Sequence, residues 1–377
     1  MFKSTLHTAL LAAAATTTAL AGEATQKTII EVEEKSWCER LWEYPVLYKN
    51  SDTFIQEFRL IGRFHGDFYE IDSDQGHDQD WVVRRLRIGA IAKLRGNIEL
   101  KAEAGFDPQF DNPWYSGLTE TSITWKPSDA FHLKVGKVPM TWTRDGWYSS
   151  NNLQTLERNN ISNNLWFPQK YFTGVTVGGK VNNWVYFAGF ASSDVNEEFG
   201  DFDASAFGVA SIGYDFGKIL GVKRALLRAD YMHQDVHPNA VNTRAFEHVG
   251  SLNFDYDAEK WGFATDLVAG AGSARQGDVW GFMVQPWYKL TDQLEVVARY
   301  THMEGQDDSI RLNRYENRIT SGRGDNYDEF YVGMNYYICG HKLKLQTGLT
   351  YAMLDDAANN GGAYEGWSWV TGVRFSF

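Results

Sequence analysis

Apolar and polar residues alternate with a period of two over most of this chain, and this pattern constrains the fold more than any other feature. In the segment RRLRIGAIAKLRG, Leu86 and Ile88 fall on one face, and Arg85 and Arg87 fall on the other. Successive side chains of a β-strand point to opposite faces, so each such segment predicts a strand with one apolar face. We find about sixteen of these segments, near residues 53–69, 84–95, 98–106, 117–126, 130–138, 171–181, 184–193, 204–216, 223–235, 245–255, 260–271, 279–289, 293–304, 328–338, 342–353 and 366–377.

The connections between these segments alternate in length. Short ones, such as 95–97 and 182–183, follow the even-numbered segments. Long ones follow odd-numbered segments, at 70–80, 107–116, 139–170, 194–203, 305–327 and 354–365. Outer-membrane barrels have short periplasmic turns and long extracellular loops. We therefore predict an all-β fold: a transmembrane antiparallel β-barrel of about sixteen strands, with its short turns in the periplasm and its long loops outside.

The composition agrees with strands that meet lipid on one face only. Aromatic residues make up 15% of the chain, yet the mean hydropathy is only −0.41. A membrane-spanning helix needs a run of roughly 20 apolar residues, and the sequence has none. The formal net charge of −12 argues against a general nucleic-acid binder.

The N-terminal part of the chain does not alternate. Residues 1–21 carry Lys3, a short apolar run and small residues up to Ala21, as in a cleaved secretory signal peptide. We interpret residues 22–52 as a periplasmic N-terminal segment and residues 53–377 as the barrel. The expected location is a bacterial outer membrane, in contact with its lipid.

The last predicted strand carries Phe375 and Phe377 in alternation. A closed barrel requires its last strand to pair with its first, because lipid leaves no partner for an open sheet edge. Bacterial barrels are similar in ending on such a strand with a terminal Phe, which the barrel-insertion machinery recognises. We therefore expect this strand to close the barrel and to contact that machinery.

The sequence contains two cysteines. Cys38 lies in the predicted N-terminal segment, and Cys339 lies in a short turn that the topology places on the periplasmic side. The two can share a rim and an oxidising compartment, which makes a disulfide possible. Two independent thiols are the alternative.

Four segments resemble, in this order, the phosphate-selective porin O and P family of bacterial outer-membrane porins. The resemblance is densest over residues 81–193. The segments are RRLRIGAIAKL, WKPSDAFHLKVGKVP, LERNNISNNLWFPQKYFTGVTVGG and WVYFAGF. Val138 stands where family members often have a lysine, and Lys170 replaces a usual arginine, which leaves phosphate specificity open.

This resemblance implies a trimeric, sixteen-stranded barrel whose third extracellular loop folds into the lumen. The third long connection here, 139–170, is the longest of all. We expect it to narrow the pore and to place charged residues there: Arg144, Glu157, Arg158 and Lys170.

The polar faces of the first strands are rich in cations. We predict that the following residues line the pore: Arg59, Arg63, Arg85, Arg87, Lys93, Arg95, Lys101 and Lys134. Rings of Arg and Lys select anions, and Arg binds oxyanions through paired hydrogen bonds. Acidic neighbours such as Glu57, Glu103 and Glu120 also face inward, and cross-strand ion pairs would weaken the selectivity.

The predicted function is passive diffusion of small hydrophilic solutes, with phosphate or other anions as the expected preference. The alternatives are a general non-selective porin, a non-conducting structural or adhesive barrel, and a sugar channel with an aromatic ladder. An enzyme is not expected, because His132 and His302 have no evident serine partner. No cofactor or metal site is expected either: the nine His lack zinc spacing, and residues 72–80 lack the calcium-loop pattern.

Overall fold

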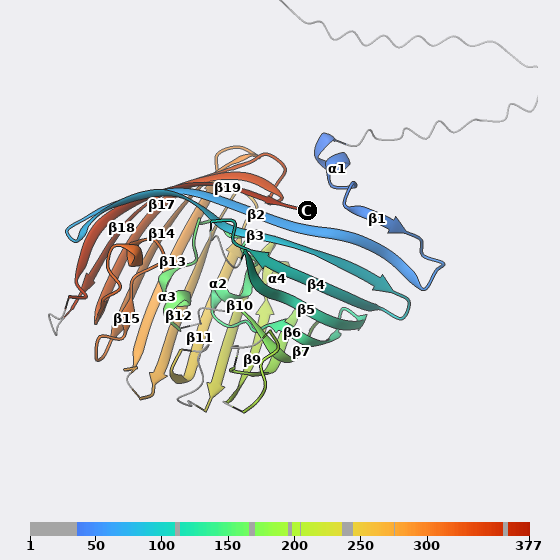
Figure 1. The fold of residues 1–377 in the computed structure, drawn as a ribbon, viewed down its shortest axis with the longest axis horizontal. Helices are drawn as coiled ribbons and strands as arrows, with labels where there is room; N and C mark the ends of the chain where they lie inside the picture. The colour runs from blue at the N-terminus through green and yellow to red at the C-terminus, as the bar shows by residue number, and fades with distance from the viewer. Residues whose placement is uncertain are drawn as a thin grey trace, which may run out of the picture.

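The computed structural model describes residues 36–377 apart from 110–113, 166–169, 195–197, 204, 236–243, 275 and 357–360. The predicted signal peptide and the first part of the N-terminal segment lie outside the described residues. Within the described part, sixteen antiparallel strands form a closed barrel (Figure 1). They are β2 (Ile55–Ser73), β3 (Gly76–Leu94), β4 (Ile98–Phe106), β5 (Tyr115–Ser128), β6 (Phe131–Pro139), β7 (Tyr171–Val181), β8 (Trp184–Ser192), β9 (Ala206–Asp215), β10 (Arg224–Gln234), β11 (Phe246–Asp257), β12 (Trp261–Gly272), β13 (Val279–Lys289), β14 (Leu294–Gly305), β17 (Asn326–Tyr337), β18 (Leu343–Asp355) and β19 (Tyr364–Ser376).

The last strand closes the ring against the first. β19 pairs with β2 along the register from Gly366↔Ser73 to Ser376↔Arg63, and Phe377 continues the ladder through its main chain to Gly62. Every strand therefore has two neighbours, as hydrocarbon requires. The predicted barrel and strand number are confirmed.

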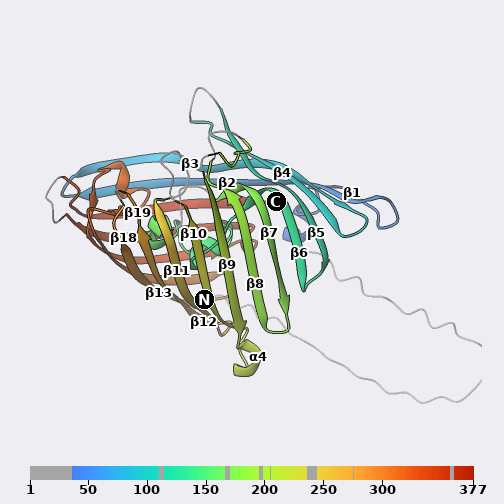
Figure 2. The same cartoon turned by 90° about the horizontal axis from the view of Figure 1, so that it is seen from below.

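Burial follows the predicted alternation. On β18 the side chains of Leu345 and Leu349 are exposed on the outer wall, while Lys344 and Gln346, on either side of Leu345, are buried in the lumen. An exposed apolar outer face is the surface that lipid covers. No helix of the described residues is long and apolar enough to cross a membrane. The one helix in a short turn, α4 (Gly217–Leu220), projects beyond the ends of β8 and β9 (Figure 2).

The predicted first long loop, 70–80, is wrong. β2 and β3 continue to Ser73 and Gly76, so only two residues join them. Gly76 has a φ of 142°, a conformation that glycine adopts without strain. β19 pairs with β2 as far as Ser73, whereas β4 pairs with β3 only from Leu86 onward. Apart from Ile71 and Gly76, residues 70–80 are polar, so they lack the alternation that marks a strand in the sequence.

The N-terminal segment is attached to the short-turn rim. It forms a short helix, α1 (Trp37–Leu41), and a strand, β1 (Val46–Lys49). β1 pairs with β2 from Val46↔Arg59 onward, where β19 has already ended. β1 thereby covers the part of the β2 edge that β19 leaves unpaired, and uncovered edges invite association.

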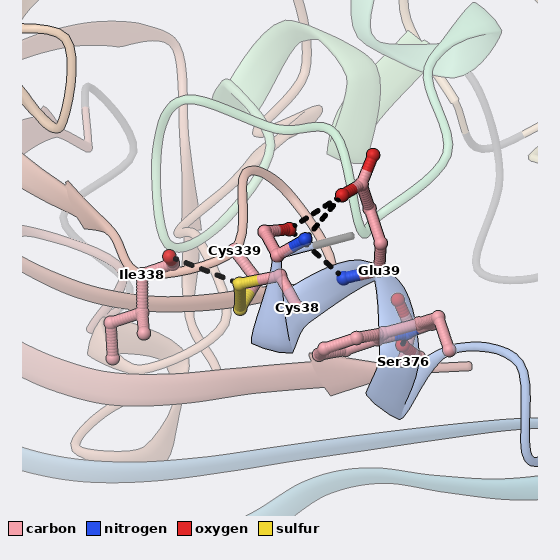
Figure 3. Close-up of a disulfide and its surroundings, with 7 residues drawn as sticks. Cys38, Glu39, Ile338, Cys339 and Ser376 are labelled. Atoms are coloured by element: carbon pink, nitrogen blue, oxygen red, sulfur yellow. Dashed lines mark hydrogen bonds between the residues drawn. A yellow bond between two sulfur atoms is a disulfide. The ribbon is translucent and has the colours of Figure 1, made fainter. Parts of the chain in front are cut away.

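A disulfide joins α1 to the barrel. Cys38 and Cys339 are bonded across a sequence separation of 301 residues, with their Cα atoms 5.8 Å apart (Figure 3). Close by, the indole Nε1 of Trp42 donates a hydrogen bond to the carbonyl of Ser376 at 2.6 Å, and its ring lies 5.9 Å from that of Phe375. The helix is thus held at the seam where the barrel closes.

We expect Cys38→Ser to accelerate trypsin cleavage after Arg40 at least tenfold. Arg40 lies on α1, whose five residues include none that is buried, so little besides the disulfide keeps this short helix folded. Peptide mapping over a digestion time course would measure the rate. Cys339→Ser, which breaks the same bond, should match it, and channel conductance should not change. Equal cleavage in wild type and variant would show that the Trp42 contacts suffice.

Candidate pore and constriction

The connection between β6 and β7 folds into the barrel and packs on its wall. It contains two short helices, α2 (Arg144–Trp147) and α3 (Asn160–Leu165), which lie inside the ring of strands (Figure 1). Ile161 and Leu165 are fully buried, and α3 packs against β12, β13 and β14. The loop therefore occupies the side of the lumen that the second half of the chain forms.

Acidic residues of this wall hold α2. The main-chain N–H of Arg144 donates to Asp266 at 2.7 Å, and its guanidinium pairs with Asp255 at 3.0 Å. The indole Nε1 of Trp147 donates to Asp230 at 3.1 Å. Arg144 also pairs with the adjacent Asp145. Several of the carboxylates of this acidic chain are thus used to fix the loop rather than to line open space.

The middle of the loop is fixed through its carbonyl groups. Lys344 donates to the carbonyl of Leu153 at 2.5 Å, and Asn335 donates to that of Gln154 at 2.9 Å. The guanidinium of Arg299, paired with Glu329 at 2.8 Å, donates to the carbonyl of Glu157 at 3.2 Å. Satisfied buried polar contacts of this kind define one position for the loop.

A buried ion pair connects the loop to the barrel seam. Arg374 on β19 pairs with Asp67 on β2, and the two side chains are 2% and 0% exposed. Arg374 also reaches the carbonyl of Leu156. Gly372 leaves room for the pair, because a Cβ there would lie 2.1 Å from the Asp67 carboxylate. One guanidinium therefore joins the first strand, the last strand and the infolded loop.

A second loop completes the constriction. The connection between β14 and β17 contains β15 (Ile310–Arg311), the 3-10 helix η1 (Glu316–Arg318) and β16 (Arg323–Gly324). The hydroxyl of Tyr315 donates to Asp67 at 2.5 Å. Asn164 on α3 exchanges two hydrogen bonds with the main chain of Arg311, at 2.8 and 3.0 Å. The two loops are thus bonded to each other and form one unit inside the barrel.

The remaining lumen is a cavity of about 1700 Å³ between these loops and the wall of the first strands. Among the described residues, fifteen Lys and Arg line it, against four Asp and Glu. The basic residues are Arg63, Arg84, Arg85, Arg87, Lys101, Lys126, Lys134, Arg158, Lys170, Lys180, Arg244, Arg311, Arg314, Arg318 and Arg323. The cavity is therefore strongly basic, although the whole chain carries a net charge of −12.

The structure brings together most of the residues predicted for the site. The cavity-lining set includes five predicted wall residues and three predicted loop residues: Arg63, Arg85, Arg87, Lys101, Lys134, Glu157, Arg158 and Lys170. Arg144 does not line it, because its charge is buried against Asp145 and Asp255.

Three predicted wall residues also lie outside this cavity, nearer the short-turn rim. Arg59 and Lys93 both pair with Glu57, at 3.6 and 3.1 Å. Arg95 donates to the carbonyl of Asp52. Their positions beyond the loops explain why they do not contribute to the constriction.

The basic residues of the second loop and its surroundings were not predicted from the sequence. Arg311 and Arg323 stand directly opposite each other on β15 and β16, and Arg244 precedes β11. We call these three residues the mouth arginines. The only signal in the sequence is the density of arginine in the long connection 305–327, which carries no periodicity.

Burial and like charges shape the ionisation of the loop residues. Burial lowers the pKa of Arg311 to about 9, and the nearby mouth arginines add to this effect. Burial lowers the pKa of Lys170 well below its usual value, and Arg158 lowers it further. Burial alone would raise the pKa of Glu157, but its paired hydrogen bonds with Arg84 more than reverse this, so the carboxylate stays charged.

The comparisons with known proteins agree with this architecture. The family model described as phosphate-selective porin O and P matches residues 58–260. Among solved structures, Pseudomonas putida OprB aligns with 10% identity and a TM-score of 0.62, covering 85% of this chain and 94% of that one. The outer membrane channel DcaP of Acinetobacter baumannii aligns with 13% identity and a TM-score of 0.56, covering 85% and 97%. A mutant of the Rh. blastica porin aligns with 12% identity and a TM-score of 0.52, covering 85% and 100%. No curated protein sequence matches the chain.

Proposed function

Since this chain belongs to the phosphate-selective porin O and P family and is a diffusion channel of the outer membrane, we propose that its lumen prefers small anions, phosphate among them. The family and the fold indicate a channel rather than an enzyme. Transport is passive, and the two infolded loops set the size limit.

The charge distribution in the lumen carries this proposal. Carboxylates such as Asp255, Asp266 and Glu329 are buried beneath the loops, where they bind α2 or Arg299. The cations remain on the opposite side, around the open cavity. An anion that enters a narrow pore loses hydration, and guanidinium and ammonium groups replace it with favourable contacts. For a permeating cation, the positive potential of the same residues raises the free-energy barrier to entry.

Some of the cationic residues that line the cavity form ion pairs with carboxylates, and these pairs weaken the positive potential in the lumen. Lys101 and Lys134 both bind Glu120, and Arg87 lies 3.4 Å from Glu103. The mouth arginines form no ion pair among the described residues, and the side chain of Arg244 donates only to the carbonyl of Asn163. We infer that the mouth arginines attract anions. The ion-paired cations on the strand wall below them then conduct these anions through the lumen.

Single-channel recording of purified protein in a planar bilayer tests the proposal. Under a KCl gradient we expect a reversal potential of anionic sign, and phosphate added at a few millimolar should reduce the chloride current. An anionic reversal potential without block would identify a general anion channel. A reversal potential near zero would indicate a non-selective porin. Folded protein that never conducts would indicate a plugged surface barrel.

The ionisation of Lys170 predicts how selectivity depends on pH. Because burial and Arg158 lower its pKa, Lys170 loses its proton at a lower pH than an ordinary lysine. Raising the pH through this lowered pKa should therefore remove one lumen charge at a pH where an ordinary lysine keeps its proton. One charge at roughly 8 Å in water with physiological screening is worth about 0.2 kcal/mol for an anion, and the opposite for a cation, so the anion-to-cation permeability ratio should drop about twofold.

The control for this prediction is Lys170→Arg. A guanidinium keeps its proton to a higher pH than an ammonium group, so the variant should keep its selectivity through the pH at which the wild type loses it. Lys170→Met should show the reduced selectivity at every pH. An equal pH response in wild type and in Lys170→Arg would assign the effect to another group.

Three further features are proposed with the channel. We expect a homotrimer, as the family resemblance implies, and recognition of the strand that carries Phe375 and Phe377 by the barrel-insertion machinery. We also expect export through cleavage of residues 1–21 as a signal peptide. Mass measurement of the detergent-solubilised protein would test the trimer, and N-terminal sequencing of protein extracted from the outer membrane would test the cleavage.

A further inference from the structure

Two histidines face each other on the outer wall of the barrel. His233 on β10 and His248 on β11 are direct partners in the strand register, and the two strands lie side by side (Figure 1). Both side chains are 45% exposed, whereas Met232 and Gln234, which flank His233, are almost completely buried on the lumen side. The imidazoles therefore point outward, close to the connection between β10 and β11.

The nitrogens of this pair are spaced as metal ligands. The two Nδ1 atoms lie 3.3 Å apart, and the rings stack with centroids 4.8 Å apart. Two Zn–N bonds of about 2.0–2.1 Å at a tetrahedral angle place their nitrogens roughly 3.3–3.4 Å apart. The paired strands thus already hold two ligand atoms at the required separation.

Glu247 supplies a third ligand of suitable type. Its carboxylate and the ligand nitrogens of the two histidines all lie within 4.8 Å of one another. The Tyr231 hydroxyl lies 2.7 Å from Nδ1 of His248, so an ion that binds this nitrogen displaces the hydroxyl. Small side-chain rotations would bring three ligands around one point, and the exposed side would leave a fourth position for water.

The donor set selects the kind of ion. Calcium and magnesium take oxygen ligands, whereas two imidazoles and one carboxylate suit zinc and related transition metals. A bound cation would use one lone pair of each imidazole.

We propose that His233, His248 and Glu247 form a binding site for a zinc-class divalent ion on the outer wall, at the long-loop end of β10 and β11. The site is separate from the pore, because the strand alternation places these side chains on the opposite face of the barrel from the lumen. The sequence does not show it as a motif, since the two histidines are 15 residues apart on different strands.

Calorimetric titration of the purified full chain in detergent with zinc chloride at neutral pH tests the site. We expect about one ion per chain. His233→Ala and His248→Ala should each weaken binding at least tenfold, and Glu247→Gln should weaken it severalfold. His77→Ala is the matched control, because His77 is an exposed histidine on the β2–β3 hairpin and should leave binding unchanged.

A second measurement separates loss of binding from loss of folding. Zinc in excess should raise the thermal midpoint of the wild-type protein, since an ion that binds only the folded state stabilises it, and it should not raise that of His248→Ala. Both histidine variants should keep the wild-type single-channel conductance in KCl, which shows that their barrels are intact. Zinc affinity that is unchanged in both histidine variants, or absent from the wild type, overturns the proposal.

Discussion

Replacing Arg311 and Arg323 together by glutamate is expected to lower the anion-to-cation permeability ratio at least fivefold. The two residues face each other at the cavity, where like charges directly opposite destabilise the pairing and produce a strong positive field. Each reversal changes the charge by two units. At roughly 8 Å in water with physiological screening, the pair is worth about 1 kcal/mol for an anion, and the effect on a cation has the opposite sign.

The packing of the loop should survive this change. Arg311 binds α3 through its main-chain N–H and carbonyl, which the substitution keeps. The reversal potential under a KCl gradient measures the ratio. Lys218→Glu with Lys223→Glu is the matched control: it changes the net charge equally, but in and beside α4 at the short-turn rim, outside the cavity. A similar shift in that control would mean that net charge, rather than the mouth arginines, sets the selectivity.

Arg374→Met is expected to lower the free energy of unfolding by about 3–5 kcal/mol. Removing one partner of a buried ion pair leaves the other charge uncompensated, and Asp67 would remain almost fully buried. The substitution also removes the contact with the carbonyl of Leu156, so the infolded loop should loosen. Urea unfolding followed by tryptophan fluorescence measures the first effect, and increased current noise in single channels measures the second.

The double variant Asp67→Asn with Arg374→Met provides the test of this explanation. It removes both charges. In the wild-type protein the Tyr315 hydroxyl donates to Asp67, and the asparagine side chain keeps an acceptor for this hydrogen bond. Because replacing a whole buried pair is often close to neutral, the double variant should recover more than half of the lost stability. A double variant less stable than Arg374→Met alone would mean that Asp67 stabilises the seam independently of its partner.

The predicted strands were mostly right, because the information that defines them is local. On β18 and β19 the alternation of apolar and polar residues continues to the strand ends, and the structure agrees within two residues. The hairpin of β2 and β3 was missed because its outer part has no lipid-facing side. There the main-chain ladder holds the strands, for example at Ile71↔Asp78, and main-chain pairing leaves no period in the side chains.

The site was predicted less completely than the fold. Arg85 and Lys101 were predicted from the polar faces of their strands, and both line the cavity. Arg144 has the same residue type and lies in the expected loop, yet Asp255, more than 100 residues away, neutralises it. Whether a loop arginine is a pore charge or a structural ion pair depends on such a partner, and no local pattern reveals it.

By itself, the sequence determined the sixteen-stranded barrel, the faces of its strands and the family. The barrel and the strand faces follow from a two-residue period, which each strand carries independently of the others, whereas the family follows from the resemblance of four segments between residues 81 and 193. Only the tertiary structure decided that a second loop joins the first in the lumen, that the acidic wall is buried beneath them, and that the mouth arginines meet. Those outcomes depend on contacts between residues far apart in the chain, such as Arg144 with Asp255, and no local pattern encodes them.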